Sequence, residues 1–72
     1  MYASTSIPNI DRLLRRPVVQ EMTGLSRSSI YAKMADGSFP RPVQIGARAV
    51  AWKESDILNW MQQLPEAREV QP

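Results

Sequence analysis

Apolar side chains recur at helical spacing near the start of the chain and again a few residues later. Val18, Val19 and Met22 fall on one side of a segment that opens with a proline and is followed by Gly24. Proline is tolerated in the first turn of a helix, and glycine readily takes the left-handed conformation that ends one. The pattern therefore predicts a first helix over residues 17–23.

A second helix is predicted over residues 26–35, after a very short connection. Ser26 can accept a hydrogen bond from the free backbone N–H groups that open this helix. Ile30 and Met34 lie four residues apart and therefore share one face, to which Leu25 adds. A helix stop, a tight turn and a capped helix in immediate succession predict a helix-turn-helix.

The proline-containing segment 39–42 must run extended, because a residue before proline is driven out of the helical region. Two short runs follow, 43–45 and 49–52, around a glycine-containing turn at 46–48, and they predict a β-hairpin. Alternation along both runs places apolar side chains on one hairpin face, which is expected to cover the helices. The residues expected on this face are Val43, Ile45, Val50 and Trp52.

A final helix is predicted to open over residues 53–56 and to end at Pro65. Glu54 and Asp56 lie in its first turn, where the helix dipole favours negative charge. Two positions apart, they do not face each other as a carboxylate pair for acid–base chemistry. The apolar stripe that is expected to close the core consists of Ile57, Trp60, Met61 and Leu64.

The remaining segments define the organisation of the chain. Residues 1–11 show no helical or strand period and are predicted to form a flexible N-terminal arm. Residues 12–64 are predicted to form the folded domain, and residues 65–72 a C-terminal tail. The apolar stretch 13–15 is expected either to pair as a strand or to pack beneath the first helix.

Length and composition exclude several classes of protein. A chain of 72 residues is sufficient for one small domain. It has no cysteine and no histidine, so disulfides, zinc ligation by thiolate or imidazole, and the usual general base near neutral pH are all excluded. No phosphate-binding glycine loop or nucleophile elbow occurs. We therefore expect that the chain is not an enzyme and that it holds neither a metal ion nor a cofactor.

The apolar runs are far shorter than the roughly 20 residues that span a bilayer, so a cytoplasmic protein without membrane contact is expected. The large apolar side chains could line a ligand pocket or a stacking platform for single strands. We expect a core instead, and no small-molecule ligand, because two tryptophans are a large share of the apolar area that so short a chain can bury. The residues concerned are Phe39, Trp52, Ile57, Trp60 and Met61.

Positive charge is concentrated in the body of the chain. Residues 12–53 hold eight Arg or Lys against Glu21 and Asp36, a net charge of +6, whereas the chain from Glu54 onward has one arginine against four acidic residues, a net charge of −3. Asp11 supplies the last negative charge, and the formal total is +2. A basic body beside an acidic end can steer the molecule toward a polyanion in one orientation, although an ordinary solvated surface has the same composition.

The predicted elements follow the order helix, tight turn, helix, hairpin, helix. This is a mainly α fold with a small β-hairpin, and the order is that of a winged helix-turn-helix, in which the hairpin lies over nucleic-acid backbone as a wing. Short hydroxyl and basic residues gather at the opening of the second helix. The combination predicts double-stranded DNA as the partner.

Four stretches of the chain carry a resemblance to a known family. They are Leu-Leu-Arg-Arg-Pro (13–17), Thr-Gly-Leu-Ser-Arg-Ser-Ser-Ile-Tyr (23–31), Gly-Ser-Phe-Pro-Arg-Pro-Val (37–43) and Arg-Ala-Val-Ala-Trp-Lys-Glu-Ser-Asp-Ile (48–57). At this spacing the chain resembles the AlpA family, small prophage-associated transcriptional regulators similar to phage excisionases and to MerR-type winged domains, over about residues 12–64. The resemblance implies sequence-specific DNA binding that switches genes of a phage or mobile element, often an integrase or excision function.

The resemblance implies that residues 26–35 form a recognition helix in the major groove. Arg27 is then the candidate for a bidentate contact to guanine N7 and O6, with Ser28 and Ser29 near bases or phosphates. Tyr31 is expected either to reach a phosphate through its hydroxyl or to pack partly on the core. Lys33 is expected to contact the DNA backbone.

Other candidate residues lie outside or at the start of that helix. Ser26 is expected to be a structural cap rather than a reader of sequence. The wing, about residues 43–52, carries Arg48 at its tip for a phosphate or the minor groove, and Arg41 is assigned to flanking backbone. Arg15 and Arg16 are expected either to touch phosphate or to be solvated arginines.

Two alternative functions stay open at this point. One is an excisionase-like architectural factor that bends DNA to direct a recombinase, and the other is a protein–protein interaction module whose basic face meets an acidic protein. A single DNA-binding module buries only roughly 600 to 1,000 Å² on DNA, so self-association on adjacent sites is also expected.

Overall fold

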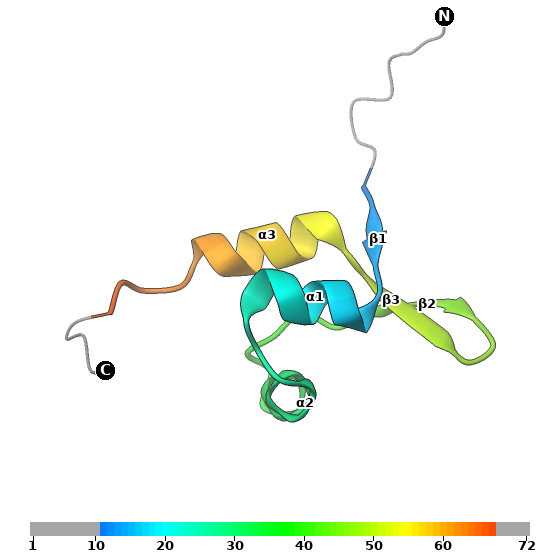
Figure 1. The fold of residues 1–72 in the computed structure, drawn as a ribbon, viewed down its shortest axis with the longest axis horizontal. Coiled ribbons are helices and arrows are strands. Elements are labelled where there is room, and N and C mark those ends of the chain that lie inside the picture. Colours follow the sequence, from blue (N-terminus) through cyan, green and yellow to red (C-terminus); the bar gives the residue numbers. More distant parts are fainter. Residues whose placement is uncertain (1–10, 68–72) are drawn as a thin grey trace, which may run out of the picture.

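The computed structural model describes residues 11–67. Three helices and a small sheet follow one another in the predicted order (Figure 1), which confirms the mainly α fold with a β-hairpin. Most of the predicted arm, and the end of the predicted tail, lie outside the described residues. The elements are β1 (Leu13–Leu14), α1 (Arg16–Thr23), α2 (Arg27–Ala35), β2 (Val43–Gly46), β3 (Ala49–Lys53) and α3 (Glu54–Gln62).

The turn between α1 and α2 forms as its sequence predicts. Gly24 has φ 77°, and its N–H donates to the Gln20 carbonyl at 2.8 Å, which ends α1 in the left-handed conformation that glycine tolerates best. Ser26 is extended, with φ −76° and ψ 167°, and its hydroxyl accepts from the Ser29 N–H at 3.1 Å. The predicted end of the first helix at Gly24 and the predicted cap of the second helix at Ser26 are therefore both confirmed.

The sheet is antiparallel throughout and has the strand order β1-β3-β2. The two alternatives for residues 13–15 are both partly realised, because β1 pairs with β3 while Leu14, opposite Trp52, is buried in the core. Leu13 pairs with Lys53 and is 51% exposed. The first strand therefore closes one edge of the sheet with a single inward side chain.

The predicted apolar face of the hairpin is wrong. Val43 lies opposite Ala51 and Gln44 opposite Val50, and the register shifts between Gln44 and Gly46. Directly opposed residues share a face and successive residues alternate, so the two predicted pairs of apolar residues lie on different faces. Ala51 and its neighbour Trp52 are both fully buried, which means that both faces of β3 are covered near its end. The apolar residues of the predicted face that stay exposed are Ile45 and Val50.

The core confirms the expectation that the aromatic residues are structural. Phe39 packs edge-on against Trp60, with ring centroids 4.8 Å apart. The Trp52 indole N–H donates to the Pro40 carbonyl at 2.9 Å, and that of Trp60 donates to the Ser38 carbonyl at 2.7 Å. Two indoles thus hold the extended segment that leads from α2 to the hairpin. The buried apolar cluster consists of Leu14, Val19, Ile30, Phe39, Trp52 and Ile57.

The end of α3 differs from the prediction. The helix stops at Gln62, and Leu64, which was expected in the apolar stripe, is 51% exposed. Leu64 precedes Pro65, and the proline ring disfavours helical backbone in the residue before it. The helix therefore ends before the last position of the stripe reaches the core.

The start of α3 is held by residues far away in the sequence. Lys53 at the N-cap position makes no side-chain capping bond. Instead, the Asp11 carboxylate accepts from the Ser55 N–H at 3.0 Å and from its hydroxyl at 2.6 Å, while the Glu54 N–H donates to the Arg12 carbonyl at 2.8 Å. The Arg12 guanidinium donates twice to the Glu54 carboxylate, at 3.1 and 2.6 Å. Glu54 therefore has an ion-pair partner in addition to the helix dipole.

These contacts predict a loss of stability in acid. Hydrogen bonds from Ser55, with the side-chain bond foremost, lower the pKa of Asp11 from its ordinary value of 3.8, and the hydrogen bond from Arg12 lowers the pKa of Glu54 from 4.5. A carboxyl group with a lowered pKa in the folded state contributes stability above its ordinary pKa and loses it as pH falls through the folded value. The free energy of unfolding in urea is therefore expected to fall as pH drops below about 4.5.

The double variant Asp11→Asn with Glu54→Gln is the matched control for this titration. The double variant should be less stable at neutral pH, and its free energy of unfolding should depend less steeply on pH. Part of the pH dependence should remain because of Asp36, since hydrogen bonds from Ser38 lower the pKa of that carboxyl group. An unchanged dependence on pH in the double variant would contradict the assignment.

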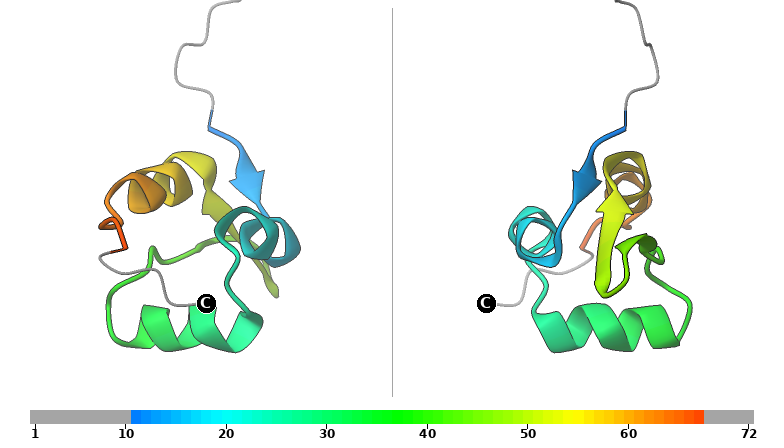
Figure 2. Two further views of the ribbon diagram at one scale, coloured as in Figure 1. Left: turned by 60° about the vertical axis from the view of Figure 1, so that its left-hand side comes forward. Right: turned by 90° about the vertical axis from the view of Figure 1, so that its right-hand side faces the viewer.

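Helix α2 lies at one side of the domain, below the other two helices in Figures 1 and 2. In every view of Figures 1 and 2, α2 lies at the bottom of the molecule and α3 near the top, with α1 between them in height. In Figure 1 the hairpin extends sideways beyond the helices. Within residues 11–67, none of the helices has the length and apolar character that crossing a membrane requires.

Candidate nucleic-acid interface

The outer face of α2 presents its polar side chains to solvent. Arg27 and Ser28 are exposed, and Tyr31 is 41% exposed, while Ile30 on the opposite face is completely buried. Arg27 and Tyr31 are four residues apart and Ser28 and Tyr31 three, so these three side chains share one side of the helix. Ser29 and Lys33 lie at the borders of the exposed face and are half-buried.

Three serines form a hydroxyl network around the start of α2. The Ser26 hydroxyl accepts from the Ser29 N–H and donates to the Ser29 hydroxyl at 3.0 Å, and it lies 3.4 Å from the hydroxyl of Ser28. Ser26 is thus the structural cap that the sequence predicts. The network also fixes the Ser29 side chain against the cap, and the Ser28 side chain remains on the exposed surface.

Ser26→Ala is expected to destabilise the domain by about 1 kcal/mol, because the Ser29 N–H loses its acceptor. Ser26→Asp is the matched control, since an aspartate at this position caps as well as serine does. Chemical unfolding of both variants measures the difference. Equal stabilities for the two variants would show that the cap contributes nothing.

Arg27 stacks on Tyr31. The guanidinium carbon lies 5.6 Å from the centre of the tyrosine ring, within the range of a cation–π interaction. Both residues line a shallow open depression of about 530 Å³ at the start of α2, together with Ser26 and Ser28. The stack places the guanidinium over the ring while Arg27 remains exposed to solvent.

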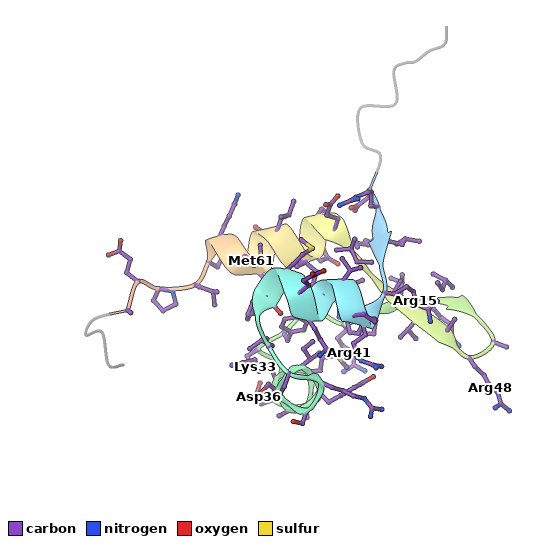
Figure 3. All side chains as sticks on the ribbon, viewed as in Figure 1. Arg15, Lys33, Asp36, Arg41, Arg48 and Met61 are labelled. Atoms are coloured by element: carbon purple, nitrogen blue, oxygen red, sulfur yellow. The ribbon has the colours of Figure 1, made fainter. Side chains whose placement is uncertain are left out.

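A second hollow, of about 350 Å³, joins three elements of the fold. Arg15 and Arg16 come from the start of α1, Tyr31 from α2, and Arg48 from the turn of the hairpin. In Figure 3, Arg48 extends from the hairpin turn toward the side of the molecule on which α2 lies. The remaining lining residues are Pro17, Val50 and Trp52.

The structure brings together some predicted site residues and leaves others apart. Tyr31 lines both hollows, so it connects the start of α2 with the arginines of α1 and the hairpin. Arg41 is exposed in the segment before β2, and Lys33 lies on α2 near Asp36; neither is among the residues that line the two hollows.

Sequence analysis missed the residue that shapes the hairpin turn. The Gln44 side-chain amide donates to the carbonyls of Gly46 and Ala47, at 2.9 and 3.1 Å. These bonds hold the turn that carries Arg48 next to the bulge in β2. In the sequence, Gln44 is a polar residue between two apolar ones in the expected strand. This pattern indicates that its side chain points outward, but not that it bonds to the turn.

The acidic side chains of the described residues do not form a cluster suited to a metal ion. Within residues 11–67 no three or more of the His, Cys, Asp and Glu side chains converge in a way that could hold a metal ion. The polar side chains that line the two hollows belong mainly to arginines, serines and Tyr31.

The fold is that of a winged helix-turn-helix domain. It has a helix-turn-helix with an exposed second helix, followed by a hairpin and a third helix. The chain belongs to the family described as "Prophage CP4-57 regulatory protein (AlpA)", whose model matches residues 12–66. This confirms the resemblance found in the sequence.

Two relatives illustrate the membership. The chain is 44% identical over 57 residues to the uncharacterized protein ORF88 of Enterobacteria phage P4, covering 76% of this chain and 65% of that protein. It is 34% identical over 58 residues to the DNA-binding transcriptional activator AlpA of Escherichia coli (strain K12), covering 72% of this chain and 83% of that protein. The matched region thus spans a little under two thirds of the phage relative.

Proposed function

We propose that this chain is a sequence-specific double-stranded DNA-binding regulator of prophage or mobile-element genes, with α2 in the major groove and the hairpin on the adjacent backbone. The name of the Escherichia coli relative, a DNA-binding transcriptional activator, supports the class of activity. The family description supports the prophage setting.

The observation that carries the proposal is the position of four side chains. Arg27, Ser28 and Tyr31 are exposed on α2, and Arg48 projects from the hairpin toward the same side of the molecule. The major groove of B-DNA is about 12 Å wide and admits an α-helix, and a wing beside it meets the flanking phosphates. The arrangement therefore offers one surface for base edges and a second for backbone.

The proposed roles follow from the chemistry of each side chain. Arg27 has the planar fork that matches guanine N7 and O6, and Ser28 beside it has a short hydroxyl for a base or a phosphate. Ser29 is proposed to act nearby, with its hydroxyl oriented by Ser26. Lys33 and Arg41, which line neither hollow, are proposed to contact backbone and to add affinity without sequence preference.

A selection of bound duplexes from a random pool tests the proposal. Affinity for the selected duplex and for a scrambled duplex is then measured at several salt concentrations. The proposal predicts a clear preference for the selected sequence, and an affinity that falls with salt for both duplexes, because bound arginines release counterions from phosphate. Equal affinity for the two duplexes, or no binding at low ionic strength, would contradict it.

Self-association on adjacent sites is part of the proposal. One module of this size buries only about 600 to 1,000 Å² of its own surface on DNA, which limits the affinity of a single copy. Mobility-shift titrations of a duplex with one site and a duplex with two sites are expected to show tighter, stepwise binding to the latter. Tight binding as a single one-to-one complex would count against it.

A further inference from the structure

We infer that the hollow between α1, α2 and the hairpin is a seat for one DNA phosphate, bound jointly by Arg15, Arg16 and Arg48, with the Tyr31 hydroxyl as a fourth donor. The inference rests on the proposed function and makes it more specific. It states that these residues act on a single phosphate, not on separate points along the backbone.

The residues that line the hollow are basic or neutral. Three arginines from two parts of the chain contribute to it, and none of the described lining residues is acidic. Among residues 11–67 the recorded ion pair is that of Arg12 with Glu54, which lies elsewhere. The three arginines therefore border the same hollow without a recorded ion-pair partner among residues 11–67, and an anion placed there would be attracted by all three.

The donors are also available. Arg16 uses its Nε–H on Gln20, at 3.1 Å, which orients the guanidinium, and within residues 11–67 its terminal N–H groups make no recorded hydrogen bond. Arg48 and the Tyr31 hydroxyl make no recorded hydrogen bond within the described part of the chain, whereas the Trp52 indole N–H is already committed to Pro40. The seat is thus built from arginine and tyrosine donors, which form short, charge-assisted hydrogen bonds to phosphate oxygens.

The size and lining of the hollow suit a phosphate group. Most of the lining surface is polar, and Pro17, Val50 and Trp52 supply the apolar remainder. A volume of about 350 Å³ leaves room for a phosphate group with several waters, since one water takes up about 30 Å³. Pro17 has no N–H, so the anion is held by side chains more than by the start of α1.

A shared phosphate has a consequence that separate contacts lack. The seat joins α1, α2 and the hairpin at one point of the DNA backbone, and Tyr31 continues from it to Arg27 at the reading surface. One phosphate would then set the position of α2 along the groove. Because the arginines act on the same group, the effects of their removal should not be additive.

A methylphosphonate scan tests the inference with the full chain. The selected duplex is prepared with one phosphate at a time replaced by the uncharged methylphosphonate, and binding is measured for the wild-type protein, Arg15→Ala, Arg48→Ala and Arg41→Ala. Arg41 is the matched control, an exposed arginine that does not line the hollow. Thermal unfolding of each variant checks that the fold is unchanged.

The expected result is one phosphate whose neutralisation weakens wild-type and Arg41→Ala binding about 10-fold, the size of a charged hydrogen bond. At this same position the modification should have little further effect on Arg15→Ala and on Arg48→Ala. Tyr31→Phe should show an intermediate effect, because it keeps the ring and loses the hydroxyl.

If Arg15→Ala and Arg48→Ala remove the effect of the modification at two different phosphates, or at none, the shared seat is wrong, while the proposal of DNA binding is unaffected. Failure of the wild-type protein to prefer its selected duplex would instead overturn the proposed function, and the seat with it.

Discussion

Arg27→Ala is expected to weaken binding to the selected duplex by about 1 to 3 kcal/mol and to relax the sequence preference at one or two base pairs. The residue stands at the start of α2, exposed and supported by the Tyr31 ring. Removing the guanidinium leaves the guanine acceptors without their bidentate partner. Affinity measured on duplexes with each base changed in turn locates the relaxed position.

Lys33→Ala is the matched control for Arg27→Ala. It removes a positive charge from the same helix, at a half-buried position that lines neither hollow. All duplexes should be weakened alike, and the salt dependence should become shallower by about one unit, since a phosphate contact carries no sequence information. Equal losses on selected and random duplexes for Arg27→Ala would remove Arg27 as the residue that reads sequence.

Trp52→Ala is expected to cost about 3 to 5 kcal/mol of folding free energy, the largest effect of a single substitution in the domain. Trp52 is completely buried, and its indole donates to the Pro40 carbonyl. The substitution leaves a cavity at the centre of the core and an unpaired carbonyl in the segment before the hairpin. Small domains are stable by only about 5 to 15 kcal/mol, so a large part of the folded state should be lost at ordinary temperature.

Trp60→Phe is a matched control for this prediction. Its side chain is half-buried and donates to the Ser38 carbonyl, so the variant loses one hydrogen bond and little volume. Chemical unfolding should show a cost of about 0.5 to 1.5 kcal/mol, well below that of Trp52→Ala. Comparable costs for the two substitutions would contradict the central place of Trp52 in the core.

The parts of the fold that local chemistry determines could be predicted from the sequence. Gly24 ends α1 and Ser26 caps α2 through bonds that span three or four residues, and both are visible as sequence signals. The alternation of apolar residues was sufficient to predict the hairpin. It did not reveal the register shift after Gln44 or the burial of Ala51, because these depend on which elements cover each face of β3.

Contacts between distant residues could not be predicted. Asp11 caps α3 through Ser55, 44 residues away, and Arg12 pairs with Glu54, 42 residues away. No local pattern marks such partners. Asp11 therefore looked like part of an unstructured arm, although its carboxylate belongs to the start of the last helix.

The candidate site shows the same division. Helical spacing placed Arg27, Ser28 and Tyr31 on one exposed face, because that face follows from sequence position. That Arg15 and Arg48 line the same hollow depends instead on how the hairpin packs against α1. From the sequence, Arg48 is a candidate contact to a phosphate or the minor groove, and Arg15 either touches phosphate or is an ordinary solvated arginine.

The central claim is that α2 lies in the DNA groove with the hairpin beside it, and site-directed cleavage measures this directly. The chain has no cysteine, so single variants Ser28→Cys on α2, Ala47→Cys in the hairpin turn and Gln62→Cys on α3 can each carry a tethered iron chelate that cuts nearby DNA. The account predicts cleavage within the selected site from position 28, cleavage at its flank from position 47, and none above background from position 62. Equal cleavage from all three positions, or the strongest from position 62, would contradict it.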